Sequence, residues 1–349
     1  MSALVDAIKK VATGPHLTKD LSQEEARLAM TEILSGQADP VQAAIFFISL
    51  RIKIETHEEN MGVLEAIQAS TQQSTAEVDQ LLILSDPFNG FNRHCPISAF
   101  LPAVLAASGL ASLSQGVKEM GPKFGVTHSQ VLAEAGVNVD LTIEQSRQRI
   151  ENSELAWSFI DQQSATPELY ALQDLRTRMI KRPCLATLEK LIMPIKARGK
   201  THLQIGFVHK AYPPVLAKLA QQAGFDSALI IRGIEGGILP TLREVSNCFQ
   251  STLGRAEDYS LNPVEFGIEQ STRGLLPAEG TEVTAQQTVE LGLQALSGQT
   301  GVAFDSLVLG AASALCHCGL QASPQDAAAH VRQILKSGRA KAFFEQGIG

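Results

Sequence analysis

The first seventy residues of the chain carry the apolar spacing of amphipathic helices. Ser22 precedes Glu25 by three positions, which is a signature of a helix start. Gly36 marks the end of this helix, and Thr56 starts a later one with two glutamates in its first turn. Between these signals, apolar residues recur at i, i+4, i+7 and i+8, namely Ala26, Met30, Ile33 and Leu34. The pattern predicts an all-α domain of four helices and no strand.

After about residue 75, short uninterrupted apolar runs alternate with helical stretches. Runs of this length are typical of strands that are buried on both faces of a sheet. The predicted strands are Leu81–Leu84, Ile205–Val208 and Ala228–Ile231, with Thr241–Phe249 and Asp258–Leu261 as more exposed ones. The predicted helices are Pro96–Ser108, Pro214–Ala223, Glu282–Leu296, Val302–Cys318 and Pro324–Ser337. The alternation predicts an α/β domain with a central, mostly parallel sheet flanked by helices.

Ligands of such sheets bind at the loops that leave the carboxyl ends of the strands. We therefore expect ligand-binding residues on four loops: Ser85–Cys95, Gln115–His128, His209–Pro213 and Gly233–Pro240. Within the first of them, Asn89-Gly90 predicts a tight turn. His94, His128 and His209 lie on these loops and could contact a phosphate, although a plain loop histidine is the simpler interpretation.

The composition is that of an ordinary globular protein, with 349 residues, 44% hydrophobic and 19% charged. The net charge of −7 excludes a uniformly basic nucleic-acid binder but leaves a local basic patch open. No window reaches about 18 uncharged apolar residues, so no membrane span is predicted. Five scattered cysteines predict a reduced, cytoplasmic protein, and Cys316-His317-Cys318 is interpreted as part of a core helix and not as a metal site.

Positive charge is concentrated between residues 176 and 210, where nine of the 29 basic residues face a single acidic one. The apolar spacing of Leu188, Leu191, Ile192 and Ile195 predicts a docked helix whose cations point outward. Such a surface would bind nucleic acid by releasing counterions, and we expect little sequence specificity. The sequence does not reveal a preference between DNA and RNA. A solvated charged face is the alternative. The candidate contacts are Arg176, Arg178, Lys181, Arg182, Lys190, Lys196, Arg198 and Lys200.

Several segments resemble the anthranilate phosphoribosyltransferase family of glycosyltransferases. They are Leu21–Ala26, Ile33–Gly36, Pro40–Ala44, Leu50–Thr56, Val131–Leu141 and Tyr259–Gly267, in this order. The resemblance implies a helical domain over 1–74 that contributes a homodimer interface and is joined by helices from about 167–193. It also implies a large α/β domain over 75–349.

The catalytic motifs of that family are altered here. The family's glycine-rich diphosphate loop corresponds to Asp86–Gly90, where Pro87 lacks an N–H, Phe88 adds bulk and Asp86 brings negative charge. The family's paired acidic ligands of magnesium correspond to Ile238-Leu239, which offer no hard oxygen. The groups that could still form a phosphate or ligand cleft are Asn89, Gly90, Ser98, Gly116, Lys118, Lys123 and Glu235.

We therefore expect no metal ligands and no cofactor, with magnesium bound only if phosphoribosyl pyrophosphate binding survives. Anthranilate phosphoribosyltransferase activity is expected to be absent or severely impaired. Pro87–Gly90, Arg182–Leu191 and Gly233–Gly236 also resemble the YbiB-type subgroup, which implies a dimeric nucleic-acid-binding protein. The alternative is a phosphoribosyl or other glycosyl transferase with a different acceptor, or a cleft that holds a small phosphorylated ligand.

Overall fold

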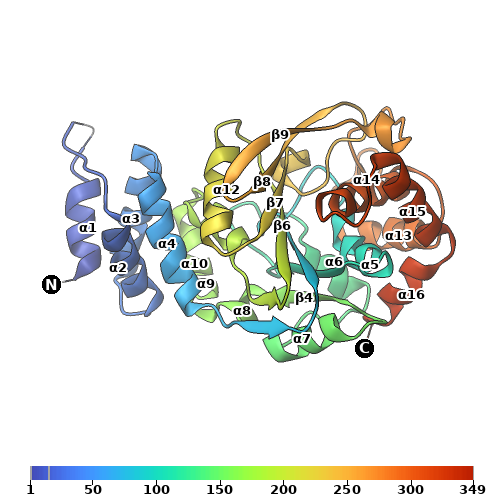
Figure 1. Cartoon of the computed structure of the whole chain (residues 1–349). Coiled ribbons are helices and arrows are strands. Elements are labelled where there is room, and N and C mark those ends of the chain that lie inside the picture. The colour runs from blue at the N-terminus through green and yellow to red at the C-terminus, as the bar shows by residue number, and fades with distance from the viewer. Residues whose placement is uncertain (1, 15, 349) are drawn as a thin grey trace.

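The computed structural model describes residues 2–14 and 16–348. The N-terminal domain is a helical bundle at one end of the molecule (Figure 1). Ser22 and Thr56 each form a complete capping box with the glutamate three positions on, so both predicted helix starts are confirmed. Its helices are α1 (Ala3–Val11), α2 (Gln23–Leu34), α3 (Pro40–Lys53) and α4 (His57–Ser70).

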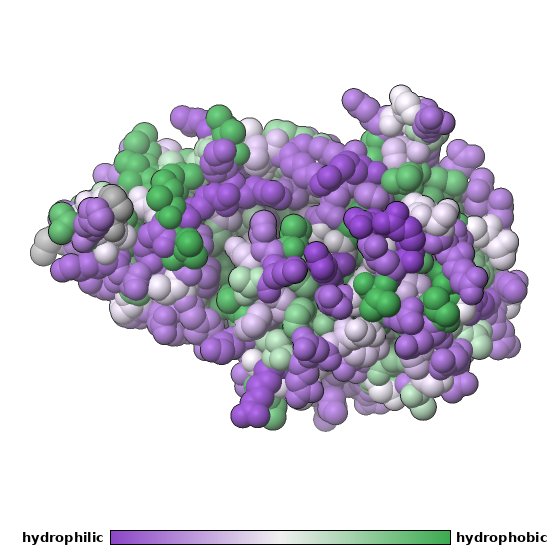
Figure 2. Space-filling model, turned by 90° about the horizontal axis from the view of Figure 1, so that it is seen from above, coloured by the Kyte–Doolittle hydropathy of each residue, from purple (hydrophilic) through white to green (hydrophobic). Residues whose placement is uncertain are grey.

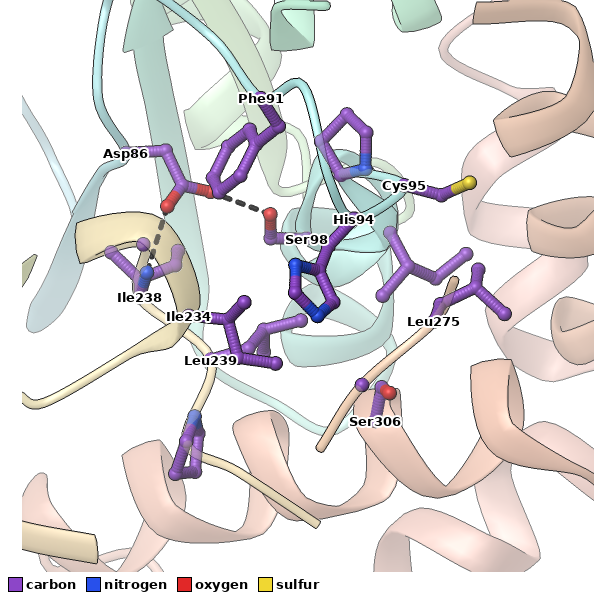
Figure 3. A pocket seen from close by; sticks show the side chains of 15 residues that line it. Asp86, Phe91, His94, Cys95, Ser98, Ile234, Ile238, Leu239, Leu275 and Ser306 are labelled. Carbon is purple, nitrogen blue, oxygen red and sulfur yellow. Dashed lines mark hydrogen bonds between the residues drawn. The ribbon is translucent and has the colours of Figure 1, made fainter. Parts of the chain in front are cut away.

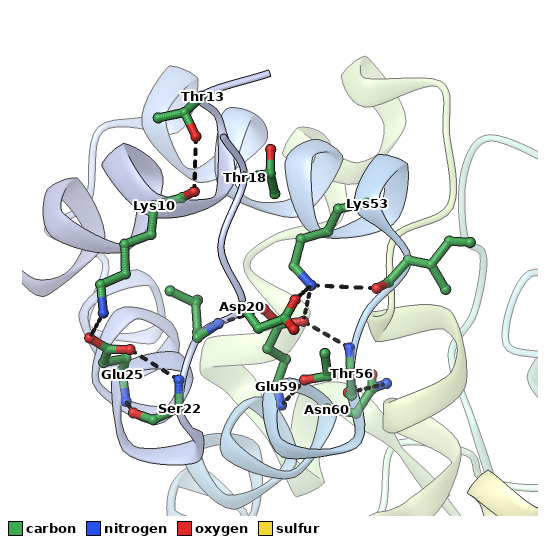
Figure 4. Close-up of polar contacts among 12 residues, drawn as sticks. Lys10, Thr13, Thr18, Asp20, Ser22, Glu25, Lys53, Thr56, Glu59 and Asn60 are labelled. Carbon is green, nitrogen blue, oxygen red and sulfur yellow. Dashed lines mark hydrogen bonds and ion pairs between the residues drawn. The ribbon is translucent and has the colours of Figure 1, made fainter. Parts of the chain in front are cut away.

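The interior of this bundle contains one fully buried carboxylate, that of Glu59 (Figure 4). It accepts hydrogen bonds from the backbone N–H groups of Leu21 at 2.9 Å and Thr56 at 2.8 Å. Lys53 completes the arrangement with an ion pair at 2.7 Å and also contacts Asp20. The carboxylate therefore joins the segment before α2 to the end of α3 and the start of α4.

The large domain is built on a seven-stranded sheet in the order β4-β3-β2-β6-β7-β8-β9. The first five strands of this order are parallel, and the last two are antiparallel. These strands are β2 (Gln80–Ser85), β3 (Ala111–Gly116), β4 (Trp157–Asp161), β6 (Lys200–Gly206), β7 (Ser227–Ile231), β8 (Ser246–Thr252) and β9 (Arg255–Leu261). A separate parallel pair joins β1 (Ser74–Ala76) to β5 (Ile195–Ala197). The predicted fold class, a small helical domain with a larger mostly parallel α/β domain, is confirmed.

Helices cover both faces of this sheet (Figure 1). Alternate residues of β2 point to opposite faces, so Leu81 and Ile83 join the core next to the helical domain, whereas Leu82 and Leu84 join the core under the C-terminal helices. The C-terminal core contains η1 (Ile97–Phe100), α5 (Leu101–Ala107), α13 (Ala285–Leu296), α14 (Val302–His317), α15 (Pro324–Lys336) and α16 (Arg339–Glu345).

The remaining short elements connect the strands. They are α6 (His128–Glu134), α7 (Ile143–Glu151), α8 (Gln162–Ala165), α9 (Pro167–Tyr170), α10 (Gln173–Met179), α11 (Leu185–Leu188), η2 (Glu189–Leu191), α12 (Tyr212–Gln222), η3 (Ile234–Gly236) and η4 (Pro263–Phe266). Within the described residues, no helix combines the length and apolar character needed to cross a membrane.

The helix predicted across residues 188–195 is wrong. The segment forms only the short α11 and η2, then runs extended into β5. The buried amide of Gln115 donates to the carbonyls of Lys190 and Ile192, and Ser74 N donates to Pro194 O. The backbone is already extended at Ile192, so no helix continues beyond η2 and the predicted outward-facing row of cations does not form.

Other boundaries also differ from expectation, most of all the strand expected over 205–208, which is β6 and ends at Gly206. The strand expected over 241–249 starts at Ser246, and the helix expected from Pro96 begins as the 3-10 helix η1 before α5. The sequence pattern also missed β3, whose buried serines Ser112 and Ser114 interrupt the apolar run. Both hydroxyls are hydrogen-bonded inside the protein, which permits their burial.

Candidate functional site

The four loops selected from the sequence do meet at the carboxyl ends of the parallel strands. Together with the end of α3 and the segment 182–190, all four border a cleft of about 490 Å³ between the two domains. Figure 2 shows the surface from above, with hydrophilic side chains spread between apolar patches. Tyr212, Phe88 and Phe207 provide apolar parts of the cleft wall.

The predicted tight turn at Asn89-Gly90 is present. Gly90 N donates to Pro87 O at 2.9 Å, and Gly90 adopts a φ of +70°. A Cβ at this position would lie 2.3 Å from Gly125 O, so both the conformation and the close approach require glycine. Asn89 is buried at the cleft wall, and Phe88 points into a small cluster with Val117 and Met120.

Asp86 does not place its charge where a diphosphate was expected, because its side chain turns into the protein (Figure 3). Ser98 Oγ donates to it at 2.5 Å, Ile238 N donates at 2.7 Å, and His128 Nε2 lies 2.7 Å away. Burial by itself would raise the pKa of Asp86, but the His128 charge and these hydrogen bonds hold the pKa below its usual value. Asp86 thus connects its own loop to Ser98 on η1, His128 on α6 and Ile238 on the loop after β7.

The Asp86, Ser98 and His128 cluster resembles a nucleophile with its base, but its surroundings do not suit catalysis. All three residues are buried, and His128 is also bonded to Ser114 on β3 at 2.9 Å. The adjoining cavity has a volume of only about 30 Å³, lined largely by apolar side chains (Figure 3). That space admits one or two water molecules and no larger substrate. Ser98 and His128 therefore position the loops, and His128 is more than a plain loop histidine.

Glu235 is held at the tip of the 233–237 loop by groups from two other loops. Its carboxylate accepts hydrogen bonds from the N–H groups of Asn92 at 3.2 Å, Arg93 at 2.9 Å and His94 at 3.1 Å. Lys123 Nζ contributes a fourth contact at 2.8 Å. Burial opposes ionisation, but the contacts with His94 and Lys123 outweigh it and hold the pKa of Glu235 well below the usual range. Glu235 is therefore an ionised carboxylate.

Several cations gather at this end of the cleft. Lys123 Nζ also donates to Gly90 O at 2.5 Å and lies over the ring of Phe91. Burial lowers the pKa of Lys123, Glu235 opposes this, and the charges of Arg182 and Arg93 lower it further. Arg182 and Arg93 therefore lie near enough to Lys123 for their charges to act on it. The exposed Lys181 precedes Arg182 in the chain.

Two of the predicted nucleic-acid contacts are not available to a polyanion on the surface. Arg176 is buried and forms a bidentate pair with Glu189, at 2.6 and 2.9 Å. Lys190 is only 8% exposed and donates to Gly206 O at 2.8 Å inside the cleft. The prediction that both point outward is wrong because the segment folds into the interdomain cleft and not into an exposed helix.

The other predicted contacts are exposed but do not form one surface. Arg178 pairs with Asp174, and Arg198 pairs with Glu77. Lys200 begins β6 and Gly206, which lines the cleft, ends it, so a strand of about 20 Å separates Lys200 from the cleft. Lys196 belongs to the nearby edge strand β5. Of the exposed predicted contacts, Arg182 lines the cleft, and Lys181 directly precedes it in the chain.

The remaining predicted cleft residues are dispersed. Gly116 ends β3 against the ring of Phe159, and Lys118 follows at an exposed position where its carbonyl accepts from Thr127. Gly90, Lys123 and Glu235 do come together, as described above. No cluster of three or more histidine, cysteine, aspartate or glutamate residues suited to a metal ion occurs in the described residues.

Magnesium does not fit the loop after β7. Ile238 is fully buried and presents only an aliphatic side chain, as does Leu239 next to it. Glu235, the nearest carboxylate of this loop, already accepts four hydrogen bonds. The oxygen ligands that magnesium prefers are therefore missing from this part of the described chain.

Sequence reasoning missed the contributions of the backbone and of the helical domain. The N–H groups of residues 92–94 carry no side-chain signature, and Arg51 reaches the cleft from α3, where its guanidinium contacts Arg182 O. A detectable signal was present for Asp86, since a charged residue directly after a buried strand must find internal partners.

A helical bundle joined to a mostly parallel α/β domain, with a cleft between them, defines the class of two-domain protein to which this chain belongs. Residues 5–71 match the helical bundle domain of the glycosyl transferase family, and residues 89–341 match the a/b domain of that family. The chain is thus a member of the glycosyl transferase family.

Its relatives include anthranilate phosphoribosyltransferase from Methanobrevibacter smithii, which is 28% identical, with 98% of each chain covered. An uncharacterized protein from Aquifex aeolicus is 31% identical over 69% of this chain and 71% of the relative. The fold matches crystallised anthranilate phosphoribosyltransferase from Thermus thermophilus with a TM-score of 0.80 at 21% identity, covering 100% of this chain and 98% of that one. The resemblance found in the sequence is confirmed at the level of the family.

Proposed function

We propose that this family member is a dimeric nucleic-acid-binding protein of low sequence specificity, which contacts the phosphate backbone at the mouth of the interdomain cleft. The observation that carries the proposal is a group of three cations at the cleft mouth: Lys123 and Arg93 both lie against Glu235, at 2.8 and 3.9 Å, and Arg182 lines the cleft. Lys181 and Arg51 extend this group on the exposed surface. A polyanion that spans the group gains affinity by releasing counterions.

The state of the diphosphate loop supports binding in place of phosphoribosyl transfer. The Saccharomyces cerevisiae enzyme of the same fold has been crystallised with PRPP and Mg. In this chain Pro87 offers no N–H, Phe88 fills the loop with an aromatic ring, and Glu235 takes up the N–H groups that follow. With Ile238 and Leu239 in place of carboxylates, we regard the diphosphate and magnesium motifs as degraded.

The exposed side of α3 supports the proposed homodimer. Val41, Ile45 and Ile52 are 64%, 41% and 77% exposed, and their spacing places them on one helix face. Figure 2 likewise shows apolar patches over the helical domain. Pairing of this face in a second copy would remove it from water and duplicate the cationic cleft mouth.

The decisive experiment reverses charge at the cleft mouth and compares it with an equal reversal elsewhere. We expect Lys181→Glu/Arg182→Glu to weaken oligonucleotide binding by at least about tenfold, because two phosphate contacts become repulsive. The matched control is Lys196→Glu/Lys200→Glu, whose positions lie at the other end of β6. Fluorescence anisotropy with single-stranded DNA, double-stranded DNA and RNA at two salt concentrations measures the effect, and light scattering checks the dimer. Equal weakening by both double variants would contradict this surface, and absence of binding at low salt would remove the function.

Lys190 favours a second candidate, in which the cleft holds a small phosphorylated ligand, as a transferase with a different acceptor would. Its single hydrogen bond within the described residues goes to Gly206 O, which leaves a buried ammonium without a full set of acceptors. Burial lowers the pKa of Lys190 to about 8, against the influence of Asp86 and Glu189. An anionic ligand would balance this charge.

Ribose 5-phosphate is a suitable probe for this candidate. It should raise the melting temperature of the natural chain and of Lys196→Met, but not that of Lys190→Met. The effect should diminish above about pH 8 as Lys190 loses its charge. An equal response from Lys190→Met, or no response from the natural chain, would rule out this use of the cleft.

A further inference from the structure

Three consecutive backbone N–H groups converge on one internal anion at the mouth of the cleft. Arg93 N and His94 N donate to Glu235 Oε1, while Asn92 N and Lys123 Nζ donate to Oε2. The Glu235 side chain is only 4% exposed. Both carboxylate oxygens are thus satisfied by donors from outside the 233–237 loop.

This arrangement has the composition of an oxyanion receptor. Successive N–H groups that point at one place form a site of positive potential, and an adjacent lysine adds a full charge. A carboxylate and a phosphate both offer oxygen acceptors with negative charge to such donors. What distinguishes this receptor is that its anion belongs to the same chain.

We propose that residues 92–94 and Lys123 form a phosphate-binding site that the chain fills with its own Glu235 carboxylate, and that removal of this carboxylate opens the site to inorganic phosphate. The site shares Arg93 and Lys123 with the cations proposed to contact nucleic acid, but it uses the backbone N–H of Arg93 and not its guanidinium. It does not depend on whether a polynucleotide binds.

The backbone at Glu235 supports a specific role for the carboxylate. Glu235 has a φ of +53°, in the left-handed region that residues other than glycine rarely adopt. Glycine, which adopts this conformation without strain, stands at the next two positions, 236 and 237, and yet position 235 is a glutamate. A residue stays in this conformation where the surrounding contacts over-determine it, and here the four donated hydrogen bonds supply those contacts.

The position would be accessible once the carboxylate is gone. Glu235 lines the 490 Å³ cleft, and the side chains of Lys123 and His94 are 21% and 19% exposed. Replacement of the Glu235 side chain by that of alanine therefore creates a space that opens towards the cleft. The N–H groups of residues 92–94 and Lys123 remain along its inner wall. The positive charges of Arg93 and Arg182 near Lys123 would further attract an anion.

The experiment is a calorimetric titration of full-length Glu235→Ala with inorganic phosphate. We expect at least tenfold tighter phosphate binding than in the natural chain. The matched control is Glu244→Ala, which removes a glutamate paired with Arg243 and Arg273 outside this site. Glu244→Ala should bind phosphate no better than the natural chain, and Lys123→Ala/Glu235→Ala should lose the affinity that Glu235→Ala gained.

A melting curve keeps the proposal testable if Glu235→Ala is unstable. Phosphate that binds only the folded variant should raise its melting temperature by at least about 2 °C, without the same shift in Glu244→Ala. Glu235→Ala with unchanged affinity and a melting temperature indifferent to phosphate would overturn the proposal. So would equal gains in Glu235→Ala and Lys123→Ala/Glu235→Ala. Oligonucleotide binding by the natural chain enters none of these comparisons, so failure of either proposal is recognisable by itself.

Discussion

Two buried glutamates of this molecule are held by nearly the same set of donors, yet they serve different regions. Glu59 in the helical domain accepts from two backbone N–H groups and Lys53 (Figure 4). Glu235 at the cleft accepts from three backbone N–H groups and Lys123. Glu59 belongs to a helical capping box, whereas Glu235 lies in a left-handed turn that borders the cleft.

The contacts of a carboxylate thus do not by themselves reveal its role. Core residues surround Glu59, so its loss would leave donors that no solvent or ligand can reach. The donors around Glu235 border a space large enough for a small molecule. We therefore interpret the first carboxylate as part of the fold and the second as a substitute for a ligand.

The largest expected effect separates these two roles by stability. Glu59→Ala should lower the free energy of unfolding by about 4 kcal/mol, because it removes the buried partner of Lys53 and leaves the N–H groups of Leu21 and Thr56 without their acceptor. Glu235→Ala should cost only about 1 kcal/mol, since water from the cleft can solvate the freed donors. Urea denaturation measures the free energy of unfolding of both variants. Glu58→Ala is the control, because it removes an exposed glutamate from the same helix turn as Glu59. Comparable losses at positions 59 and 235 would contradict the distinction.

A smaller expected effect is the pH dependence of stability, which sets Glu59 and Glu235 apart from a buried cluster of uncharged polar side chains. Ser227 Oγ lies 2.7 Å from His202 Nδ1 and 2.8 Å from His317 Nε2. Burial, with a contribution from His202, lowers the pKa of His317 to about 4, and burial also lowers the pKa of His202. Unfolding lets these histidines take up protons between about pH 6.5 and 4, so their contribution to stability falls as pH falls through that window.

Relative to His317→Asn, the natural chain should lose up to about 3 kcal/mol of stability between pH 6.5 and 4. The comparison with a variant cancels Asp161, whose pKa is raised to about 6 by burial and which acts in the opposite direction. Glu235 has a lowered pKa, so its stabilising contribution begins to fall only near the usual value of 4.5, at the acid end of the window, and it does so equally in both chains. Urea denaturation at several pH values measures the difference, and parallel stability curves for the two chains would refute the histidine assignment.

Much of the fold was predictable from local patterns. The capping boxes at Ser22 and Thr56 and the strands β2 and β7 follow from residue spacing alone. Convergence of the loops also followed, because the carboxyl ends of parallel strands share one edge of the sheet. Strand β3 was missed because its buried serines meet their partners only after folding.

The site was less predictable, because the number of charges in a segment does not reveal their exposure. Arg176 meets Glu189 only after the chain between them has folded back into the cleft. Glu235 was recognised as a cleft group, but its partners Arg93 and His94 lie more than 140 positions away and contribute backbone atoms. Neither contact has a local signature in the sequence.

The most direct test of the internal anion is a crystal structure of Glu235→Ala grown with phosphate. We predict a phosphate that accepts hydrogen bonds from the N–H groups of residues 92–94 and from Lys123, with the surrounding loops in their present positions. An ordered, unchanged loop without phosphate, or a loop that has rearranged to satisfy those N–H groups itself, would contradict the account.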